Sequence, residues 1–432
     1  MAACMAIMAL AALAPASAMA ASTLVVDDDG FASAASCDGA TVAYTTIQSA
    51  VDAAAPGDTI MVCPGTYSES VTVSTAGLNL VGPYAGINAA WCPDRLNTAT
   101  VVGGASNGFT LAADGVIVDG FRIGGSSAYG IETSELFSGY KIRNNVIEDN
   151  AAGIYLNADG SILSRVKRNC LRDNNATFSD LTPFPTAGTG IYTDQGLDNA
   201  DILVNGFRRH LNVAINLVTD LDPTDTFNVT ETSNIRVGGN NSVNDRTFLS
   251  VFNADHVYVS GNRVTQNSSG QDWNGSAIYV GGGSDIGGPG ASAITITNNK
   301  IVSTQLPNGF YAGIAVRGSA DDTVISFNTI KGTYNGISIT SDALGAAYVR
   351  GNAVWNAHNN GIEALVTEPY SGGGPATQNV FTRNGAHGSA NYDCFDNTTG
   401  TSTLGTANTW LRDGFRRNVG DTSSPAGLCR KN

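Results

Sequence analysis

The sequence predicts an all-β chain coiled into a parallel β-helix, a solenoid whose successive turns stack strand upon strand. One observation is a repeated phrase that opens on Gly-Ile and alternates in polarity, as in GIAVRGSADDTVISFNTI at 313–330. The phrase returns in varied form at positions 130, 153, 190, 214, 248, 277, 336 and 361. The other observation is an Asn that closes each repeat, at intervals of 21 to 37 residues. The closing residues are Asn145, Asn169, Asn205, Asn241, Asn262, Asn299, Asn328, Asn352 and Asn379. Strand-and-turn repeats of this length are typical of solenoids.

The amino-terminal 1–20 segment is predicted to be a secretory signal peptide. An apolar run from Ala6 to Leu13 precedes small-residue cleavage sites. The basic region expected before such a run is missing, so either the start lies upstream or the region is degenerate. The run is too short to span a bilayer, and no later stretch reaches the required length, so we expect no membrane insertion.

A short capping helix is expected ahead of the first strands. Thr45 and Gln48 have capping-box spacing, and Pro56-Gly57 ends the helix. The apolar face consists of Ile47, Ala50, Val51 and Ala54. Strands are expected at 59–62 and 70–73. A helix in this place can cover the open apolar end of a solenoid.

The segment from 44 to 73, YTTIQSAVDAAAPGDTIMVCPGTYSESVTV, resembles the amino-terminal cap and first rung of the pectin-lyase-like superfamily. Together with the rungs to about Asn379, the resemblance covers about four-fifths of the chain. It implies a single-stranded right-handed parallel β-helix. It does not select an activity, because the superfamily includes pectate and alginate lyases, polygalacturonases, pectin esterases, mannuronan epimerases and non-enzymatic members.

We expect residues 21–392 to form the β-helix with its amino-terminal cap, and residues 393–432 to form a carboxy-terminal cap. Six cysteines follow the signal peptide, which favours an oxidising compartment, either secreted, periplasmic or at the cell surface. Cys394 and Cys429 flank the last segment and would close it with a disulfide. Cys37 and Cys63 could do the same at the front, although fifteen pairings exist for six cysteines.

Charge excludes one class of partner. The formal net charge is −14, with only 23 Lys and Arg residues, so the chain has no general field to hold nucleic acid. An anionic glycan would need local basic residues or a bridging cation. The oligomeric state cannot be inferred from composition.

Two columns of side chains follow from strand alternation. The Ile positions should point inward and stack, and they are Ile131, Ile154, Ile191, Ile215, Leu249, Ile278, Ile314, Ile337 and Ile362. The next position should point outward, and the column is Glu132, Tyr155, Tyr192, Asn216, Ser250, Tyr279, Ala315, Ser338 and Glu363. On a flat exposed sheet, aromatic rings and polar groups in one column would suit an extended polysaccharide. The alternative is that Tyr is simply a good strand residue.

Loop insertions fall where the repeats are longest, between 169 and 241 and between 262 and 299. They place Arg208-Arg209-His210, Asp245-Arg246 and Asp272-Trp273 before consecutive strands. We expect these groups on one edge of the outer sheet, one rung apart. The candidate catalytic residues are Asp194, Arg209, His210, Asp245 and Asp272. The candidate substrate-binding residues are Tyr155, Tyr192, Tyr279, Trp273 and Arg246.

A cation beside a base is suited to uronate chemistry, because the cation neutralises the sugar carboxylate and the base removes the acidified C5 proton. For a neutral sugar, two carboxylates would act instead, as acid and as base or nucleophile. The alternative for Arg208, Arg209 and His210 is surface ion pairing with nearby Asp residues.

A cation site is the one cofactor hypothesis. Asp220, Asp222 and Asp225 lie close together in a loop and could hold Ca²⁺, but the sixth position of the run is Asp225, where an EF-hand requires Gly. No cofactor is otherwise implied.

Two functional classes therefore compete. One is a secreted polysaccharide lyase or glycoside hydrolase, or a protein that binds such a polymer. The other is a non-catalytic structural or adhesion solenoid at the cell surface. The Gly-His-Gly and Arg-Ile-Lys motifs of the polygalacturonases and the Asp-Pro-His motif of the epimerases are absent, which weakens the enzyme hypothesis.

Overall fold

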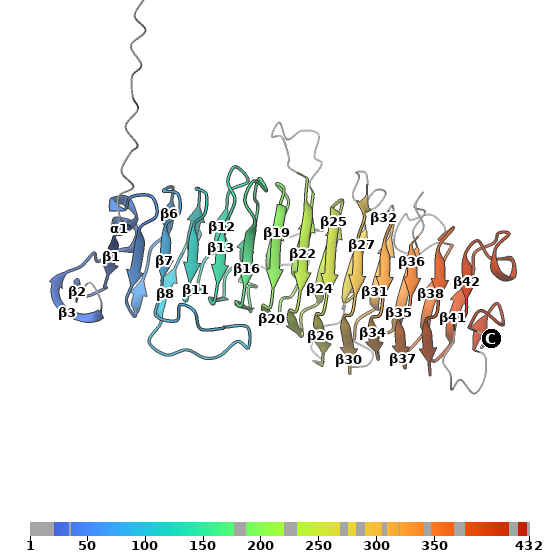
Figure 1. Ribbon diagram of the computed structural model, residues 1–432. Helices are drawn as coiled ribbons and strands as arrows, with labels where there is room; N and C mark the ends of the chain where they lie inside the picture. Colours follow the sequence, from blue (N-terminus) through green and yellow to red (C-terminus); the bar gives the residue numbers. More distant parts are fainter. Residues whose placement is uncertain are drawn as a thin grey trace, which may run out of the picture.

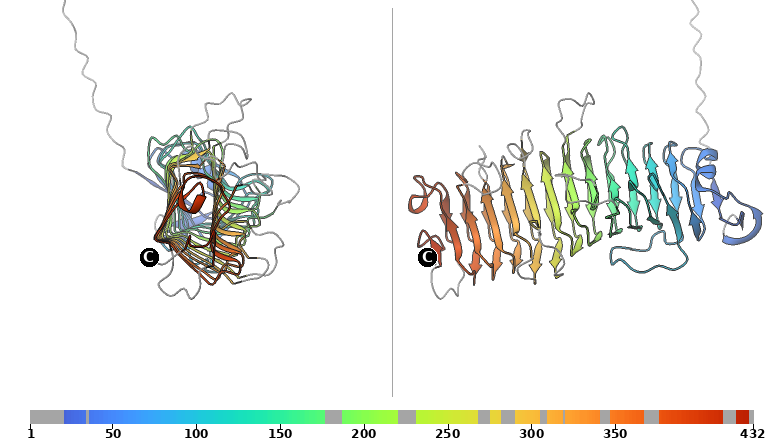
Figure 2. Two further views of the ribbon diagram at one scale, coloured as in Figure 1. Left: turned by 90° about the vertical axis from the view of Figure 1, so that its right-hand side faces the viewer. Right: turned by 180° about the vertical axis from the view of Figure 1, so that it is seen from behind.

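The computed structural model describes residues 21–33, 36–176, 187–219, 231–267, 275–281, 290–304, 309–318, 320–340, 347–366, 376–413 and 422–429. The chain forms an elongated solenoid whose strands follow one another along the long axis in sequence order (Figure 1). Seen along that axis, successive turns superpose (Figure 2). Residues 1–20 lie outside the described residues, and no described helix is long and apolar enough to cross a membrane.

Each turn adds one strand to each of three parallel sheets. Sheet 1 contains β1 (Thr23–Val26), β4 (Thr59–Val62), β7 (Asn79–Val81), β10 (Ile117–Asp119), β13 (Lys141–Arg143), β16 (Ser164–Lys167), β19 (Asp198–Leu203), β22 (Ser233–Gly238), β25 (Asp255–Ser260), β29 (Thr295–Thr297), β33 (Val324–Ser326), β36 (Tyr348–Arg350), β39 (Val380–Thr382) and β42 (Thr409–Leu411). The short strands β28 (Ala291–Ser292) and β32 (Ala320–Asp321) extend it beside β25.

Sheet 2 follows sheet 1 within each turn. It contains β5 (Gly65–Tyr67), β8 (Ala99–Val102), β11 (Arg122–Gly124), β14 (Val146–Glu148), β17 (Cys170–Arg172), β20 (Gly206–Arg208), β23 (Asn241–Val243), β26 (Arg263–Gln266), β30 (Lys300–Ser303), β34 (Thr329–Lys331), β37 (Ala353–Trp355) and β40 (Gly385–His387).

Sheet 3 completes the turn. It contains β6 (Val71–Val73), β9 (Phe109–Leu111), β12 (Tyr129–Thr133), β15 (Ala152–Tyr155), β18 (Thr189–Thr193), β21 (Val213–Val218), β24 (Thr247–Phe252), β27 (Ile278–Gly281), β31 (Ala312–Arg317), β35 (Asn335–Thr340), β38 (Asn360–Ala364), β41 (Tyr392–Asp396) and β43 (Ser423–Ser424). Stacking therefore continues within the segment after 392 that the sequence analysis assigned to a cap. A 3₁₀ turn, η2 (Thr403–Gly405), precedes β42.

The predicted inward column is confirmed. All nine of its residues are in register from β12 to β38, and each is fully buried. Because adjacent rungs are about 4.8 Å apart, each aliphatic side chain lies directly on the next and stays dry. Burying one such side chain contributes roughly 1.5–3 kcal/mol. The column thus forms a continuous part of the core, directly behind the outer side chains of sheet 3.

The predicted capping helix is present as α1 (Ile47–Ala53), at the amino-terminal end of the solenoid (Figure 1). Its N-cap is Thr46, which accepts from the Ser49 N–H, one position later than the capping-box spacing suggested. The Glu69 carboxylate accepts from the N–H groups of Ile47 and Gln48. Two free N–H groups of the first turn are therefore satisfied by a side chain from the first rung. An antiparallel pair, β2 (Phe31–Ser33) and β3 (Ser36–Val42), lies beside this end.

A ladder of amides runs through the bend between sheets 1 and 2. The Oδ1 of each member after the first accepts from the backbone N–H and the side-chain amide of the member one rung earlier. The members are Asn145, Asn169, Asn205, Asn240, Asn262, Asn299, Asn328, Asn352 and Asn384, and Asp413 closes the ladder.

Two of the nine closing Asn residues noted in the sequence are not members of this ladder. Asn241 is the first residue of β23, and the bend residue before it, Asn240, carries the ladder. Asn379 belongs to a separate amide pair with Asn408, and its predicted place is taken by Asn384. The other seven closing Asn residues are all members of the ladder.

Asp413 makes folding stability depend on pH. Burial raises the pKa of its carboxyl from 3.8 to about 7, against hydrogen bonds from Asn384 and Leu411 that lower it. The folded state therefore disfavours the ionised form. Its contribution is fully favourable below the unfolded pKa, near 3.8, and is lost as the pH rises to about 7. We expect the urea midpoint of Asp413→Asn, measured between pH 4 and pH 8, to fall less with pH than that of the wild type. Equal slopes for the two proteins would contradict this.

Three disulfides join the six cysteines of the described residues. Cys37–Cys63 and Cys394–Cys429 are the pairs that the sequence suggested. The third, Cys92–Cys170, fastens the long loop between β7 and β8 to β17. This loop lies beneath the body of the solenoid in Figure 1. It packs so closely on β20 that a Cβ at Gly206 would lie 2.0 Å from the Ala90 carbonyl oxygen, so only glycine fits there.

Candidate functional site

The outer column of sheet 3 is in the predicted register but is not flat and exposed. Strand pairing aligns all nine residues from Glu132 to Glu363. Most are buried, with Tyr155 at 7% and Tyr192 at 8% exposure. Alternation along a strand fixes which side a residue faces, but it says nothing about what covers that side.

Tyr155 and Tyr192 of the outer column belong to a cluster of stacked aromatic rings. The rings of Tyr129, Tyr155 and Tyr192 stack in sequence, with centroids 4.7 and 5.8 Å apart. The hydroxyls of Tyr155 and Tyr192 both donate to the Asp194 carboxylate, at 2.5 and 2.8 Å. Burial, followed by the contact with Asp194, raises the pKa of Tyr155. Asp194 therefore lies beside two of the predicted substrate-binding tyrosines and fixes their hydroxyls.

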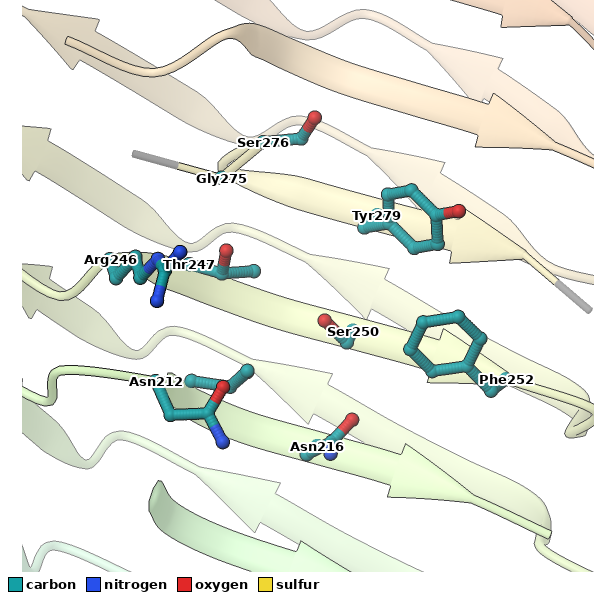
Figure 3. Close-up of a pocket in the computed structure, with 10 residues that line it drawn as sticks. Asn212, Asn216, Arg246, Thr247, Ser250, Phe252, Gly275, Ser276 and Tyr279 are labelled. Carbon is teal, nitrogen blue, oxygen red and sulfur yellow. The ribbon is translucent and has the colours of Figure 1, made fainter. Parts of the chain in front are cut away.

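A pocket of about 200 Å³ opens further along the same face, over β21, β24 and β27 (Figure 3). Arg246 and Asn212 lie at the end where the strands begin, and the rings of Phe252 and Tyr279 lie at the other. The two ring centroids are 5.2 Å apart. The pocket therefore combines a cationic end with an aromatic end.

The floor between these ends is polar. Ser250 and Asn216, adjacent in the column, both line the pocket and are nearly buried, with Asn216 at 5% exposure. The Asn216 Oδ1 atom finds no hydrogen-bond partner within the described part of the protein. A buried acceptor without a partner destabilises a protein by about 1–3 kcal/mol. Such an atom on a pocket floor is suited to accept a hydrogen bond from a bound hydroxyl.

A second polar cluster lies beyond the pocket on the same face. The guanidinium of Arg317 lies 5.9 Å from the ring centre of Tyr279 and 5.7 Å from that of Tyr311, so it connects the pocket to the next rung. Glu363 is 2% exposed and accepts a hydrogen bond from the Asn360 side-chain amide at 2.7 Å. Burial raises the pKa of Glu363 despite this bond and the nearby Arg317. Strand alternation alone places Glu363 in the outer column but does not indicate that it is buried.

Asp194 and Glu363, which lie on either side of the pocket, are too far apart to form a hydrolytic pair. Asp194 and Glu363 lie at strands six rungs apart, β18 and β38, which corresponds to roughly 29 Å at the usual strand spacing. Glycoside hydrolysis by two carboxylates needs a separation of about 5–9.5 Å. Asp194 and Glu363 therefore lack this geometry, and no carboxylate is among the described residues that line the pocket.

His210 and Asp245 are stacked one rung apart, as expected, but they face the interior and not the sheet edge. Both side chains are 0% exposed, and His210 Nδ1 lies 2.7 Å from Asp245 Oδ1. The Asp245 carboxylate also accepts from the backbone N–H of His210 and from the Ser242 hydroxyl. The predicted placement at the sheet edge is wrong. In the interior, neither side chain can contact a polymer bound on the surface.

The physical reason is a second amide ladder, formed by Asn150 and Asn174 and continued by His210 and Asp245. Asn174 Nδ2 lies 3.3 Å from His210 Nε2. The sequence holds a signal for this: each of these four residues follows a member of the first ladder by five positions. His210 and Asp245, five positions after Asn205 and Asn240, therefore occupy interior positions of the bend between sheets 2 and 3.

Arg209 and Arg246 fall in different environments. Arg209 Nε donates to the Asp173 carboxylate at 2.7 Å in an exposed ion pair, as the alternative hypothesis for this segment expected. Arg246 lines the pocket. The remaining predicted residues, Asp272 and Trp273, lie outside the described residues. So do the proposed calcium ligands Asp220, Asp222 and Asp225, and no group of three potential metal ligands occurs among the described side chains.

Comparisons with protein-family models and with curated protein sequences find no match. Solved structures do match. The catalytic unit of the GH87 α-1,3-glucanase from Streptomyces thermodiastaticus aligns with a TM-score of 0.55 and 16% identity, over 87% of this chain and 66% of its own. A mannuronic-acid-specific polysaccharide family 6 lyase from human gut microbiota aligns with a TM-score of 0.50 and 12% identity, over 81% and 84%. The chain is a parallel β-helix. At sequence identities of 16% and 12%, the likeness to these two proteins concerns the fold alone. It agrees with the parallel β-helix that the resemblance at 44–73 implied.

Proposed function

We propose that the protein binds an extended polysaccharide on the outer face of sheet 3, with one sugar unit in the pocket over β21, β24 and β27. The observation that carries this proposal is the unpartnered Asn216 Oδ1 on the pocket floor. A sugar hydroxyl supplies the missing donor. The rings of Phe252 and Tyr279 offer apolar faces for the sugar ring.

The structural neighbours support this class of ligand. One is named as an α-1,3-glucanase and another as a lyase specific for mannuronic acid, so both are proteins that act on polysaccharides. Aromatic surface beside a few directed polar groups is the usual make-up of a small-molecule site. The same combination occurs here within a single pocket.

Between the two cleavage reactions, elimination fits the pocket better than hydrolysis, because Arg246 lines the pocket and no carboxylate is among its described lining residues. In elimination from a uronate, Arg246 would neutralise the sugar carboxylate and so acidify the C5 proton. The Tyr279 oxygen, as the phenolate, would remove that proton, so that the C4–C5 double bond forms and the C4–O bond breaks with its electrons left on the leaving oxygen. The Tyr279 hydroxyl, in the pocket, is suited to protonate that oxygen.

A non-catalytic binding protein is the second candidate. The observation that favours it is the placement of His210 and Asp245 in the interior, which removes two of the acid–base groups that the sequence suggested. The two candidates share the pocket and differ only in whether a product forms.

Binding and stability of Asn216→Ala test the proposal. We expect the affinity for the bound polysaccharide to fall about tenfold, because a hydrogen bond to the ligand is lost. The thermal midpoint should stay the same or rise, since the substitution removes a buried acceptor that has no hydrogen-bond partner. The measurement is affinity electrophoresis on a panel of acidic and neutral polysaccharides. The matched control is Tyr258→Ala, which changes a half-exposed residue of sheet 1.

The same panel separates the two candidates. Absorbance of an unsaturated uronate would identify a lyase, and new reducing ends without that absorbance would identify a hydrolase. Binding without product would identify a binding protein. Unchanged affinity in Asn216→Ala, or no binding of any polymer by the wild type, would refute the proposed site.

A further inference from the structure

Five cations gather on sheet 1 and its following bend, away from the pocket. We call them the basic strip: Lys141, Arg143, Arg165, Lys167 and Arg168. Strand alternation turns their side chains outward, because Ile142 and Val166 between them are buried. The chain as a whole has a net charge of −14, so this positive charge is a local feature of the surface.

The register places like charges side by side. Lys141 pairs with Arg165, and Arg143 pairs with Lys167, on the adjacent strands β13 and β16. Like charges directly opposite each other in neighbouring strands destabilise a sheet. The fold therefore carries an electrostatic penalty at this place, and neighbouring carboxylates relieve it only in part.

Two carboxylates contact the cations of this surface. Asp119 accepts from Arg143 at 2.7 Å. Asp201 lies 3.6 Å from Arg165 and also pairs with Arg236, two rungs further on, at 2.6 Å. Among the described residues, no ion pair involves Lys141, Lys167 or Arg168. The strip thus keeps a net positive charge after its internal pairing.

We propose that the basic strip binds an acidic polysaccharide, at a site separate from the pocket of sheet 3. A polymer with anionic groups at regular intervals can contact several cations of the strip at once, because the rungs repeat at about 4.8 Å. Most of the acidic chain does not oppose this binding, since charges more than about 10 Å away are largely screened at 0.1 M salt. The strip supplies the local basic residues that an acidic chain needs to hold an anionic glycan.

The partner class follows from the compartment. Nucleic acid would also be attracted by a row of cations. The three disulfides, however, are typical of an oxidising environment outside the cytosol, where acidic polysaccharides are the common polyanions. The inference does not depend on the proposed pocket, which uses another sheet and other residues.

The double variant Lys141→Glu/Lys167→Glu tests the strip. The probe is polygalacturonate, with neutral dextran for comparison, and binding is measured at 50 and 500 mM NaCl. We expect the wild type to bind polygalacturonate in a salt-dependent way, and the strip variant to bind it at least tenfold more weakly at 50 mM. The matched control is Lys300→Glu/Lys331→Glu, which changes the net charge equally at exposed positions of sheet 2 and should bind within threefold of wild type.

Several outcomes would overturn the inference. Equal losses in the two double variants would show a general charge effect, and tighter binding of duplex DNA than of polygalacturonate would assign the strip to another polymer. Circular dichroism and a thermal midpoint equal to those of the wild type establish that the strip variant is folded. The single variant Lys167→Gln should also bind polygalacturonate more weakly than the wild type, by a smaller factor than the double variant. Retention of this salt-dependent binding in Asn216→Ala separates the strip from the pocket.

Discussion

Replacing Ile278 with Asp is expected to unfold the middle of the solenoid. Ile278 is fully buried and lies between Leu249 and Ile314 in the inward column. The substitution removes roughly 1.5–3 kcal/mol of apolar burial and adds an unpaired buried carboxyl. We expect a total loss of about 5 kcal/mol or more, which places the change among the most damaging single substitutions. Thermal unfolding followed by circular dichroism should show a midpoint lowered by more than 10 °C, or little soluble protein.

The matched control for this experiment is the same substitution at an exposed isoleucine. Ile162 is 49% exposed, and Ile162→Asp should change the midpoint by less than about 2 °C. Because each rung of a solenoid contacts mainly its neighbours, limited proteolysis of Ile278→Asp should begin near β24 to β31. Equal tolerance of the two substitutions would mean that the column does not form the core.

Asn240→Ala and Asn241→Ala should have very different effects although the residues are adjacent. The Asn240 side chain donates to Ile202 O and Asn262 Oδ1 and accepts two bonds from Asn205, at 2.8–3.2 Å. Its removal leaves several buried polar groups without partners, at about 1–3 kcal/mol each. We expect a loss of about 3–5 kcal/mol in unfolding free energy for Asn240→Ala, measured by urea denaturation.

Asn241→Ala is the control for the amide ladder, and we expect its effect to stay below about 1 kcal/mol. Asn241 is only partly buried and begins strand β23. The pair tests which of the two adjacent amides holds the bend, a point on which the sequence pattern alone gave the wrong residue. Equal losses, or a larger loss in Asn241→Ala, would contradict the observed register.

Strand alternation was enough to predict the two columns of sheet 3, because the direction of a side chain in a strand repeats every second residue. Ile278 and Tyr279 were therefore assigned to opposite sides correctly. The same rule could not separate Asn240 from Asn241, since both lie where a turn gives way to a strand. The lengths of turns, unlike the alternation within strands, vary from rung to rung.

The candidate site was harder to predict than the core. His210 and Asp245 were chosen because these residue types often perform acid–base chemistry, yet both replace amides in an interior ladder. Asn216 was named only as part of a column, and its unpartnered oxygen becomes visible only when its surroundings are known. Residue type indicates what a side chain can do, whereas burial and neighbours decide what it does.

The disulfide between Cys92 and Cys170 has a mechanical consequence. It joins residues 78 positions apart and crosses from the loop after β7 to β17. If the two ends of the chain were pulled apart, the segment between Cys92 and Cys170 could not extend until that disulfide was reduced. The extended chain would be shorter by roughly 260 Å while the disulfide is intact. The rungs between Cys92 and Cys170 would then resist tension together, whereas the rungs after β17 could unfold one at a time.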